Sequence, residues 1–103
     1  MSYNLLPYQN KILEKLGINI RLARLRRRIS HKQVCQRAKI SNATLWGIEK
    51  GNPKISLGNY AKVLFVLGLG DDLSKIALDD ELGRKLQDAD IQPKERAPKR
   101  KGS

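Results

Sequence analysis

The chain has 103 residues, which leaves room for one small domain, and its 40% hydrophobic residues include few aromatics. A single cysteine excludes an internal disulfide, and no apolar stretch has the length of a membrane span. The formal net charge is +11. These values are typical of a globular domain with a small aliphatic core and a strongly basic surface.

The charge is divided unevenly along the chain. Residues 1–64 carry 13 Lys and Arg against 2 Asp and Glu, residues 65–92 carry 3 against 7, and residues 93–103 carry 5 against 1. A polyanionic partner for the first block explains this division better than the simpler alternative, a solvated basic surface. The acidic block is expected to lie away from such a partner, which would repel it.

The first predicted elements are a lead-in and a long helix. Residues 1–10 have no clear period. From Lys11 to Arg28, apolar residues recur at helical spacing in two stripes: Leu13, Leu16, Ile20 and Ala23, then Ile18, Leu22 and Leu25. One stripe is enough to pack on the rest of the domain. The second stripe needs another cover, which is the lead-in, the C-terminal helices or another chain.

Two short helical patterns follow, and each opens with a serine. Ser30 is a good N-cap, and Gln33 stands where a capping box needs it. After a turn over residues 39–41, Ser41 caps the second pattern, and Gly51 ends it before a proline. This is the layout of a helix-turn-helix, in which the inward-facing residues are Val34, Ala38, Leu45 and Ile48.

Three further helical segments complete the prediction. Ser56 caps a helix that runs to about Leu67, with Leu57, Ala61, Leu64 and Phe65 internal. Asp71 or Asp72 caps a short helix, and a last helix covers residues 79–88. We therefore predict an all-α fold, a compact bundle of about five helices with an extra C-terminal helix. Its expected parts are a lead-in (1–10), a helix-turn-helix domain (11–78), a C-terminal helix (79–90) and a basic flexible tail (91–103).

The segment from about Leu16 to Leu69 resembles the lambda-repressor-like helix-turn-helix domain of the Xre/phage-repressor family. The matching motifs are Leu16-Gly17-x-x-Ile20-Arg21-x-x-Arg24, Ser30-His31-x-x-Val34-Cys35 and Ile40-Ser41-x-x-Thr44-Leu45-x-x-Ile48-Glu49-x-Gly51. Residues 16–103 are also similar to the HipB-like antitoxin repressors encoded beside HipA-type kinase toxins. That similarity is carried by residues 19–28, by Ser56-Leu57-Gly58-Asn59-Tyr60-Ala61-Lys62-Val63-Leu64, and by Leu82-Gly83 before a basic, proline-containing tail.

The resemblance implies five α-helices, a homodimer and double-stranded operator DNA as partner. It places base contacts at Asn42, Ala43 and Gly47 and phosphate contacts at His31 and Thr44. It also implies a structural ion pair between Arg24 and Glu49. Trp46, one turn after Asn42, is expected to face the DNA groove as well, and basic neighbours add phosphate candidates: Arg26, Arg27, Arg28, Lys32 and Lys50.

Four positions depart from the family pattern. His31 stands where Gln is usual, so its charge depends on pH, and Cys35 replaces a small Ala. Lys39 replaces a turn Gly in a left-handed conformation, at a cost of about 1 kcal/mol. Gly47 replaces a side chain that often reaches a base.

Two of the proposed base contacts have alternative explanations. Asn42 can pair bidentately with adenine, but it also suits the start of a helix. Trp46 in the core would need a partner for its indole N–H, and the inward positions already hold Leu45 and Ile48, so we expect it to point outward.

The acidic block carries more leucines than a small domain can bury. We therefore place the dimer interface there, with Leu67, Leu69 and Leu73 at its centre. One His and one Cys, at positions 31 and 35, cannot complete a metal site without a second pair, and the Asp79-Asp80-Glu81 cluster lacks partner ligands. No catalysis, metal or cofactor is therefore expected.

These observations lead to two classes of function. The first is a sequence-specific transcriptional repressor, the autoregulating antitoxin of a HipA-like kinase toxin operon. The alternatives are a protein-interaction antitoxin or adaptor that mainly neutralises a partner protein, and a stand-alone Xre-type regulator without a toxin. The tail contacts either DNA phosphates or the toxin. The expected location is the cytoplasm, on the nucleoid, with no membrane partner.

Overall fold

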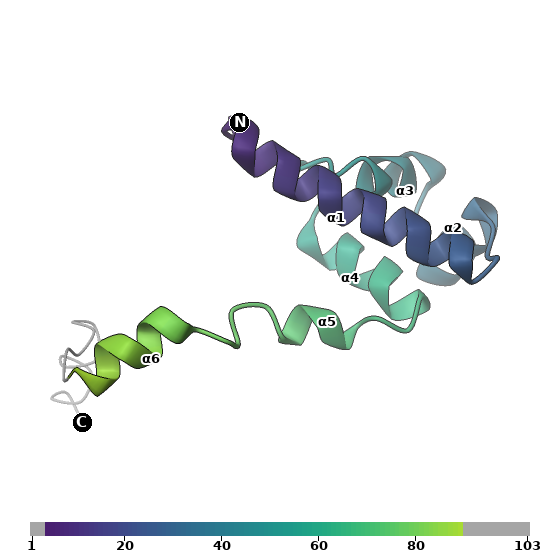
Figure 1. Ribbon diagram of the computed structural model, residues 1–103. Coiled ribbons are helices and arrows are strands. Elements are labelled where there is room, and N and C mark those ends of the chain that lie inside the picture. The colour runs from purple at the N-terminus through teal and green to yellow at the C-terminus, as the bar shows by residue number, and fades with distance from the viewer. Residues whose placement is uncertain (1–3, 90–103) are drawn as a thin grey trace, which may run out of the picture.

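The structure, a computed structural model, describes residues 4–89, and in this part every regular element is a helix, with no strand (Figure 1). The all-α prediction is therefore confirmed. The tail expected at 91–103 lies outside the described residues. The helices are α1 (Pro7–Arg26), α2 (His31–Ala38), α3 (Asn42–Glu49), α4 (Leu57–Val66), α5 (Asp71–Ser74) and α6 (Glu81–Asp88).

The first helix begins earlier and ends earlier than predicted. Pro7 starts α1, because its fixed φ suits a helix and its missing N–H needs no partner there. The Gln9 side chain also accepts a hydrogen bond from the Leu6 N–H at 2.9 Å. The lead-in prediction was therefore wrong for residues 7–10, whose polar sequence shows no apolar period. At the other end, α1 stops at Arg26 because Arg28 adopts a left-handed conformation with φ 54°.

The caps of the helix-turn-helix follow the sequence. The Ser30 Oγ accepts from the Gln33 N–H at 3.0 Å, and the Gln33 Oε1 accepts from the Ser30 N–H at 2.8 Å. The Ser41 Oγ accepts from the Thr44 N–H at 3.1 Å. Lys39 holds the turn at φ 57°, so a lysine adopts the left-handed conformation for which glycine is usual.

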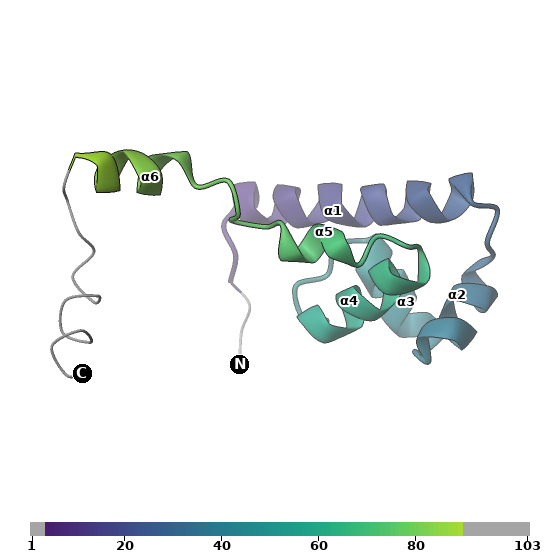
Figure 2. The same cartoon turned by 90° about the horizontal axis from the view of Figure 1, so that it is seen from below.

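The core lies between α1 and the three helices that follow it. The largest fully buried side chains come from each of α1 to α4: Ile20, Val34, Leu45, Ile48 and Val63. Figure 2 shows α1 lying along one side of α2, α3 and α4. The first of the two predicted stripes of α1 faces this core, and the second faces solvent.

Two predictions for α4 were wrong. Leu57 and Phe65 are 68% and 78% exposed rather than internal. Tyr60 is buried in their place, and its hydroxyl donates to the Asn52 carbonyl at 2.9 Å. An apolar pattern that covers most of a helix does not show which side faces the core, and here the residues at the two ends face outward.

The cap of α5 differs from the prediction, and α5 and α6 differ from each other in packing. Gly70 precedes α5, with no side-chain cap from either aspartate, and Asp80 caps α6 by accepting from the Gly83 N–H at 3.0 Å. Leu69 and Leu73 pack against the core near α5. In both ribbon views α6 lies apart from α1–α4 (Figures 1 and 2). None of the helices between residues 4 and 89 combines the length and the hydropathy of a membrane span.

Candidate nucleic-acid interface

The second helix of the helix-turn-helix, α3, divides its residues between core and solvent. Leu45 and Ile48 are fully buried, whereas Asn42, Ala43 and Trp46 are exposed. Trp46 points outward, and its side chain is 53% exposed. The exposed face of α3 therefore offers one amide and one aromatic ring to a partner, with the small Ala43 between them.

The structure places Gly47 differently from Asn42 and Trp46. A Cβ at this position would lie 3.1 Å from the Ile55 side chain and 3.6 Å from the Asn52 Cβ. The Gly47 carbonyl accepts from the Asn52 N–H at 2.9 Å. A Cβ at position 47 would therefore face the loop between α3 and α4, and the base contact placed at Gly47 stays a prediction. A side chain here would run along the loop.

His31 is covered by Trp46. The two ring centroids lie 4.6 Å apart with a tilt of 32°, and the His31 Nε2 is buried without a hydrogen-bond partner. The His31 Nδ1 lies 3.8 Å from the Cys35 Sγ. In this conformation the buried Nε2 is not accessible to a phosphate, and the contact that the resemblance implied at His31 stays a prediction.

Cys35 is a buried thiol between α2 and the turn. Burial raises its pKa above the ordinary value of 9.0, and the nearby Glu49 carboxylate raises it further, while Arg24 lowers it. Its Sγ donates towards the Ser41 carbonyl at 3.7 Å. The sulfur therefore remains a protonated packing group at neutral pH.

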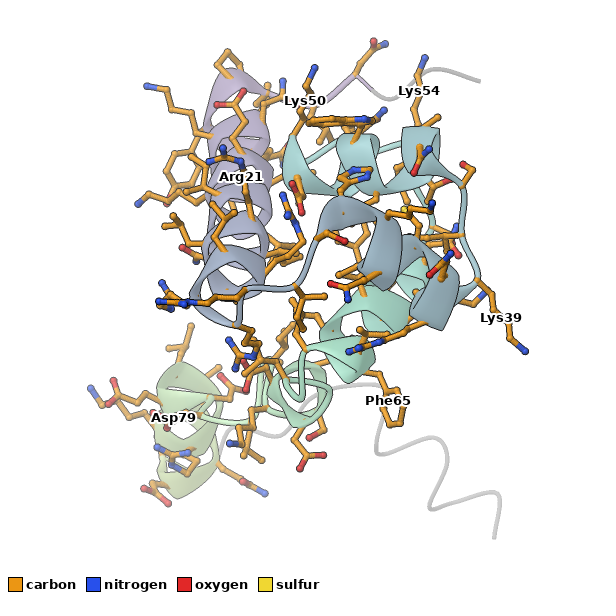
Figure 3. All side chains as sticks on the ribbon, turned by 90° about the vertical axis from the view of Figure 1, so that its right-hand side faces the viewer. Arg21, Lys39, Lys50, Lys54, Phe65 and Asp79 are labelled. Carbon is orange, nitrogen blue, oxygen red and sulfur yellow. The ribbon has the colours of Figure 1, made fainter. Side chains whose placement is uncertain are left out.

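The basic candidates surround this face of α2 and α3. Figure 3 views the molecule towards these helices, with Lys50 and Lys54 at one end, Lys39 at another and Arg21 on α1 beside them. Lys32 is exposed in the first turn of α2, where backbone N–H groups and the helix dipole favour an anion. The arginines at the junction of α1 and α2, residues 26–28, are exposed as well.

Two of the predicted phosphate contacts already have partners within the chain. The Thr44 hydroxyl lies 2.9 Å from the Ser41 Oγ, which caps α3. The Arg27 Nη1 donates to the Ala23 carbonyl at 3.0 Å, which ties this guanidinium to its own helix. Both groups retain further hydrogen-bonding capacity, so each can bind a phosphate while it keeps its partner within the chain.

Lys54 was missed at the sequence level. It is exposed in the loop after α3, on the same side as Lys50 (Figure 3), and its backbone N–H donates to the Asn52 Oδ1 at 2.8 Å. The signal was present in the sequence, because a lysine beside Asn52-Pro53 follows the predicted end of the recognition helix. A loop at this place is well positioned for a phosphate.

Arg24 and Glu49 meet inside the domain. The Arg24 Nε lies 2.7 Å from the Glu49 Oε2, and the two side chains are 10% and 3% exposed. The pair thus joins α1 to the end of α3 and holds the exposed face of α3 at one angle to the domain. The close approach also needs Gly17, because a Cβ there would lie 2.6 Å from the Glu49 carbonyl oxygen.

The predicted dimer centre is largely occupied within one chain. Leu67 is only 3% exposed and belongs to the core, so its placement at the subunit interface was wrong. Leu69 and Leu73 are half-buried and line a groove of about 260 Å³ with Leu16 and Ile20. The remaining leucines of the acidic block and one isoleucine are exposed: Ile76, Leu78, Leu82 and Leu86.

Among residues 4–89, no group of three or more His, Cys, Asp or Glu side chains is arranged to hold a metal ion.

Comparison with known families identifies the class of protein. A family described as a helix-turn-helix domain matches residues 15–75, which is more than half of the chain. The chain belongs to this helix-turn-helix family, and it is a helix-turn-helix protein of the DNA-binding kind. No curated protein and no solved structure matched it.

Proposed function

We propose that this protein is a sequence-specific transcriptional repressor that binds operator DNA as a homodimer. The observation that carries the proposal is the exposed face of α3, with Asn42 and Trp46 in solvent and lysines around it. An α-helix with such a face fits the major groove of B-DNA, where base edges can be distinguished.

Each part of this surface has a role in the proposal. Asn42 pairs with adenine, and Trp46 and Ala43 make apolar contacts such as those with a thymine methyl group. Lys32, Lys50 and Lys54 contact phosphates, as does the N-terminus of α2. These phosphate contacts fix the position of α3, and the contacts from α3 supply the specificity.

Binding as a homodimer follows from the length of α3. One eight-residue helix reaches few base pairs, so two copies related by a two-fold axis are needed for a specific site. The two half-sites are then about 34 Å apart, which is one turn of the duplex, or a multiple of that distance.

A duplex from upstream of the protein's own gene tests this proposal. Its affinity is compared with that of a shuffled duplex while salt is raised from about 50 to 200 mM. If roughly six or more phosphates are contacted, binding weakens by about 1,000-fold over this range, and the upstream duplex remains the tighter ligand. Equal affinities for both duplexes at every salt concentration contradict the proposal.

We further propose that the repressor is the autoregulating antitoxin of a HipA-like kinase toxin, acting without catalysis in the cytoplasm on the nucleoid. The similarity of residues 16–103 to HipB-like antitoxins supports this role. A feature that suits a protein partner is the groove of about 340 Å³ between α2 and α4, with a basic rim and with Phe65 beside it. Phe65 lies at the far end of the domain from Lys50 and Lys54 (Figure 3). A toxin with an acidic and apolar surface can therefore bind while DNA is bound.

Co-expression with a kinase encoded beside the gene tests the antitoxin role. Phe65→Ser is expected to lose the kinase and keep the operator, and Leu57→Ser, at another exposed position on the same helix, is expected to keep both. If both variants still bind the kinase, the groove is not the docking site. A gene neighbourhood without a kinase favours the stand-alone regulator.

A further inference from the structure

Two apolar helix faces lie uncovered in the described part of the chain. The first is on α1, where Ile18, Leu22 and Leu25 are 54%, 40% and 44% exposed. At about 100° per residue, these three positions point directly away from buried Ile20 and Ala23. Within residues 4–89 no other helix buries them, because α1 packs on the core through its opposite side.

The second uncovered face is on α6. Leu82 and Leu86 are 67% and 42% exposed, and with Ala89 they repeat at the same i, i+4, i+7 spacing as the face on α1. Exposed leucines on an amphipathic helix that packs on nothing in its own domain are unusual in a folded protein. Each face therefore lacks a partner, and each is the kind of surface that another helix covers.

The two faces match in length and in charge. The eight residues of α6 span about 12 Å, and the face from Ile18 to Leu25 spans about 10 Å. Exposed charges on α1 are mainly basic, with Lys11, Lys15, Arg21 and Arg26 against Glu14. The segment of residues 71–88 carries six acidic against three basic residues. Packing one on the other buries leucines and brings opposite charges together at the rim.

The path of the chain disfavours pairing of the two faces within one molecule. Leu73, in α5, lines a groove with Leu16 and Ile20 on the core side of α1. To reach the opposite face, the chain between α5 and α6 would have to pass half-way around α1. Half the circumference of a helix about 10–12 Å wide is about 16–19 Å. Six linking residues, 75–80, span about 20 Å only when fully extended. They are not extended, because the Leu78 N–H donates to the Lys75 carbonyl at 3.0 Å.

We infer that α6 of one chain packs on the Ile18–Leu22–Leu25 face of α1 in a second copy of the chain, and that the second copy returns the contact. A two-fold axis then generates two identical contacts in each dimer and leaves neither face exposed. The arrangement rests on the homodimer of the proposed function. It assigns the interface to an exchange of α6 helices and leaves Leu67 in the core.

Chemical cross-linking between single introduced cysteines tests the pairing. Every variant carries Cys35→Ala, so that only the introduced thiols react with a short bismaleimide. Leu22→Cys and Leu86→Cys preparations, mixed and allowed to exchange, are expected to give a covalent dimer that neither gives alone. Leu57→Cys mixed with Leu86→Cys is the control and is expected to give none. The inference is overturned if the first mixture gives no covalent dimer. It is also overturned if a chain carrying both Leu22→Cys and Leu86→Cys gives mainly an internally linked monomer.

Light scattering gives an independent measurement. Leu82→Glu is expected to raise the dimer dissociation constant by about 100-fold or more, because each dimer loses two contacts and gains two charges. Leu57→Glu is expected to leave it unchanged, and circular dichroism checks that both remain folded. An unchanged dissociation constant for Leu82→Glu overturns the inference.

Operator binding by the unmodified protein separates the two proposals. A cross-linked dimer without operator binding contradicts the repressor, and operator binding without the cross-link contradicts only the interface.

Discussion

Arg24 near the end of α1 holds Glu49 at the end of α3 through two hydrogen bonds, from Nε to Oε2 at 2.7 Å and from Nη2 to Oε1 at 3.2 Å. The remaining Arg24 Nη1 donates to the Ile29 carbonyl at 3.3 Å. One guanidinium thus connects α1, the loop before α2 and the end of the recognition helix. The exposed face of α3 is positioned by a group that is itself buried.

Removing one partner of this pair is expected to destabilise the domain strongly. Arg24→Ala leaves the Glu49 carboxylate buried without its counter-charge, which costs about 3–5 kcal/mol in the free energy of unfolding. Urea denaturation measures the change. The control is Arg84→Ala, which breaks the exposed pair with Asp79 at 2.9 Å and is expected to cost about 0–1 kcal/mol. Similar losses for the two variants contradict a structural role for the buried pair.

The contact of α1 with the end of α3 depends on a missing side chain. A Cβ on Gly17 would lie 2.6 Å from the Glu49 carbonyl oxygen and 2.7 Å from the Gly51 nitrogen, and both are backbone atoms that cannot turn away. Gly17→Ala is therefore expected to lower the free energy of unfolding by about 1–3 kcal/mol or more. Gly58→Ala, whose Cβ would meet only the Ser56 Oγ at 3.8 Å, is expected to raise it by about 0.5–1 kcal/mol. Thermal melts of the two variants that shift in the same direction contradict this account.

Local chemistry made much of the fold predictable. Ser30 and Ser41 cap helices whatever the rest of the chain does, because an N-cap needs only a side-chain oxygen and the next few N–H groups. Gly51 ends α3 because it adopts a φ of 73°, a conformation that glycine takes at no steric cost. Arg24 and Glu49 are 25 residues apart, so only the family resemblance connected them.

The failures came from questions that depend on the whole fold. The start of α1 at Pro7 rests on one proline and one glutamine rather than on an apolar period. The apolar residues of α4 and its C-cap include Leu57, Phe65 and Leu67. Which of these side chains is buried depends on where α2 and α5 lie. The covering of His31 by Trp46 was also unpredictable, because it joins an outward residue of α3 to the first turn of α2.

Alkaline pH is expected to destabilise the domain through two buried acids. Burial raises the pKa of the Tyr60 hydroxyl above its ordinary value of 10.0, and burial followed by Glu49 raises that of Cys35 above 9.0. The unfolded chain therefore loses these protons at a lower pH than the folded one, so stability is complete below about pH 9 and falls as pH rises further. Melting temperatures between pH 8 and 11 measure the slope. Tyr60→Phe combined with Cys35→Ala is expected to flatten it, and an unchanged slope contradicts this assignment.

The single tryptophan reports on the DNA surface. Trp46 is 53% exposed, so acrylamide is expected to quench its emission readily in the free protein. Operator DNA is expected to protect it, because the exposed face of α3 enters the groove. His31→Ala, which removes the ring 4.6 Å away, is expected to increase quenching of the free protein, and Gln36→Ala on the same helix is the control. Equal quenching with and without operator places Trp46 outside the interface.

Asn42 and Lys32 separate base readout from phosphate positioning. Asn42 is exposed in the first turn of α3 and does not cap it, because Ser41 does. Asn42→Ala is therefore expected to cost about 1–3 kcal/mol on the operator and little on random DNA. Lys32→Ala, in the first turn of α2, is expected to weaken both ligands equally and to reduce the salt slope by about one unit. Affinities measured on both duplexes over a range of salt distinguish these patterns. If Asn42→Ala instead weakens both duplexes equally, Asn42 contacts phosphate, and specificity depends on Trp46 and on DNA shape.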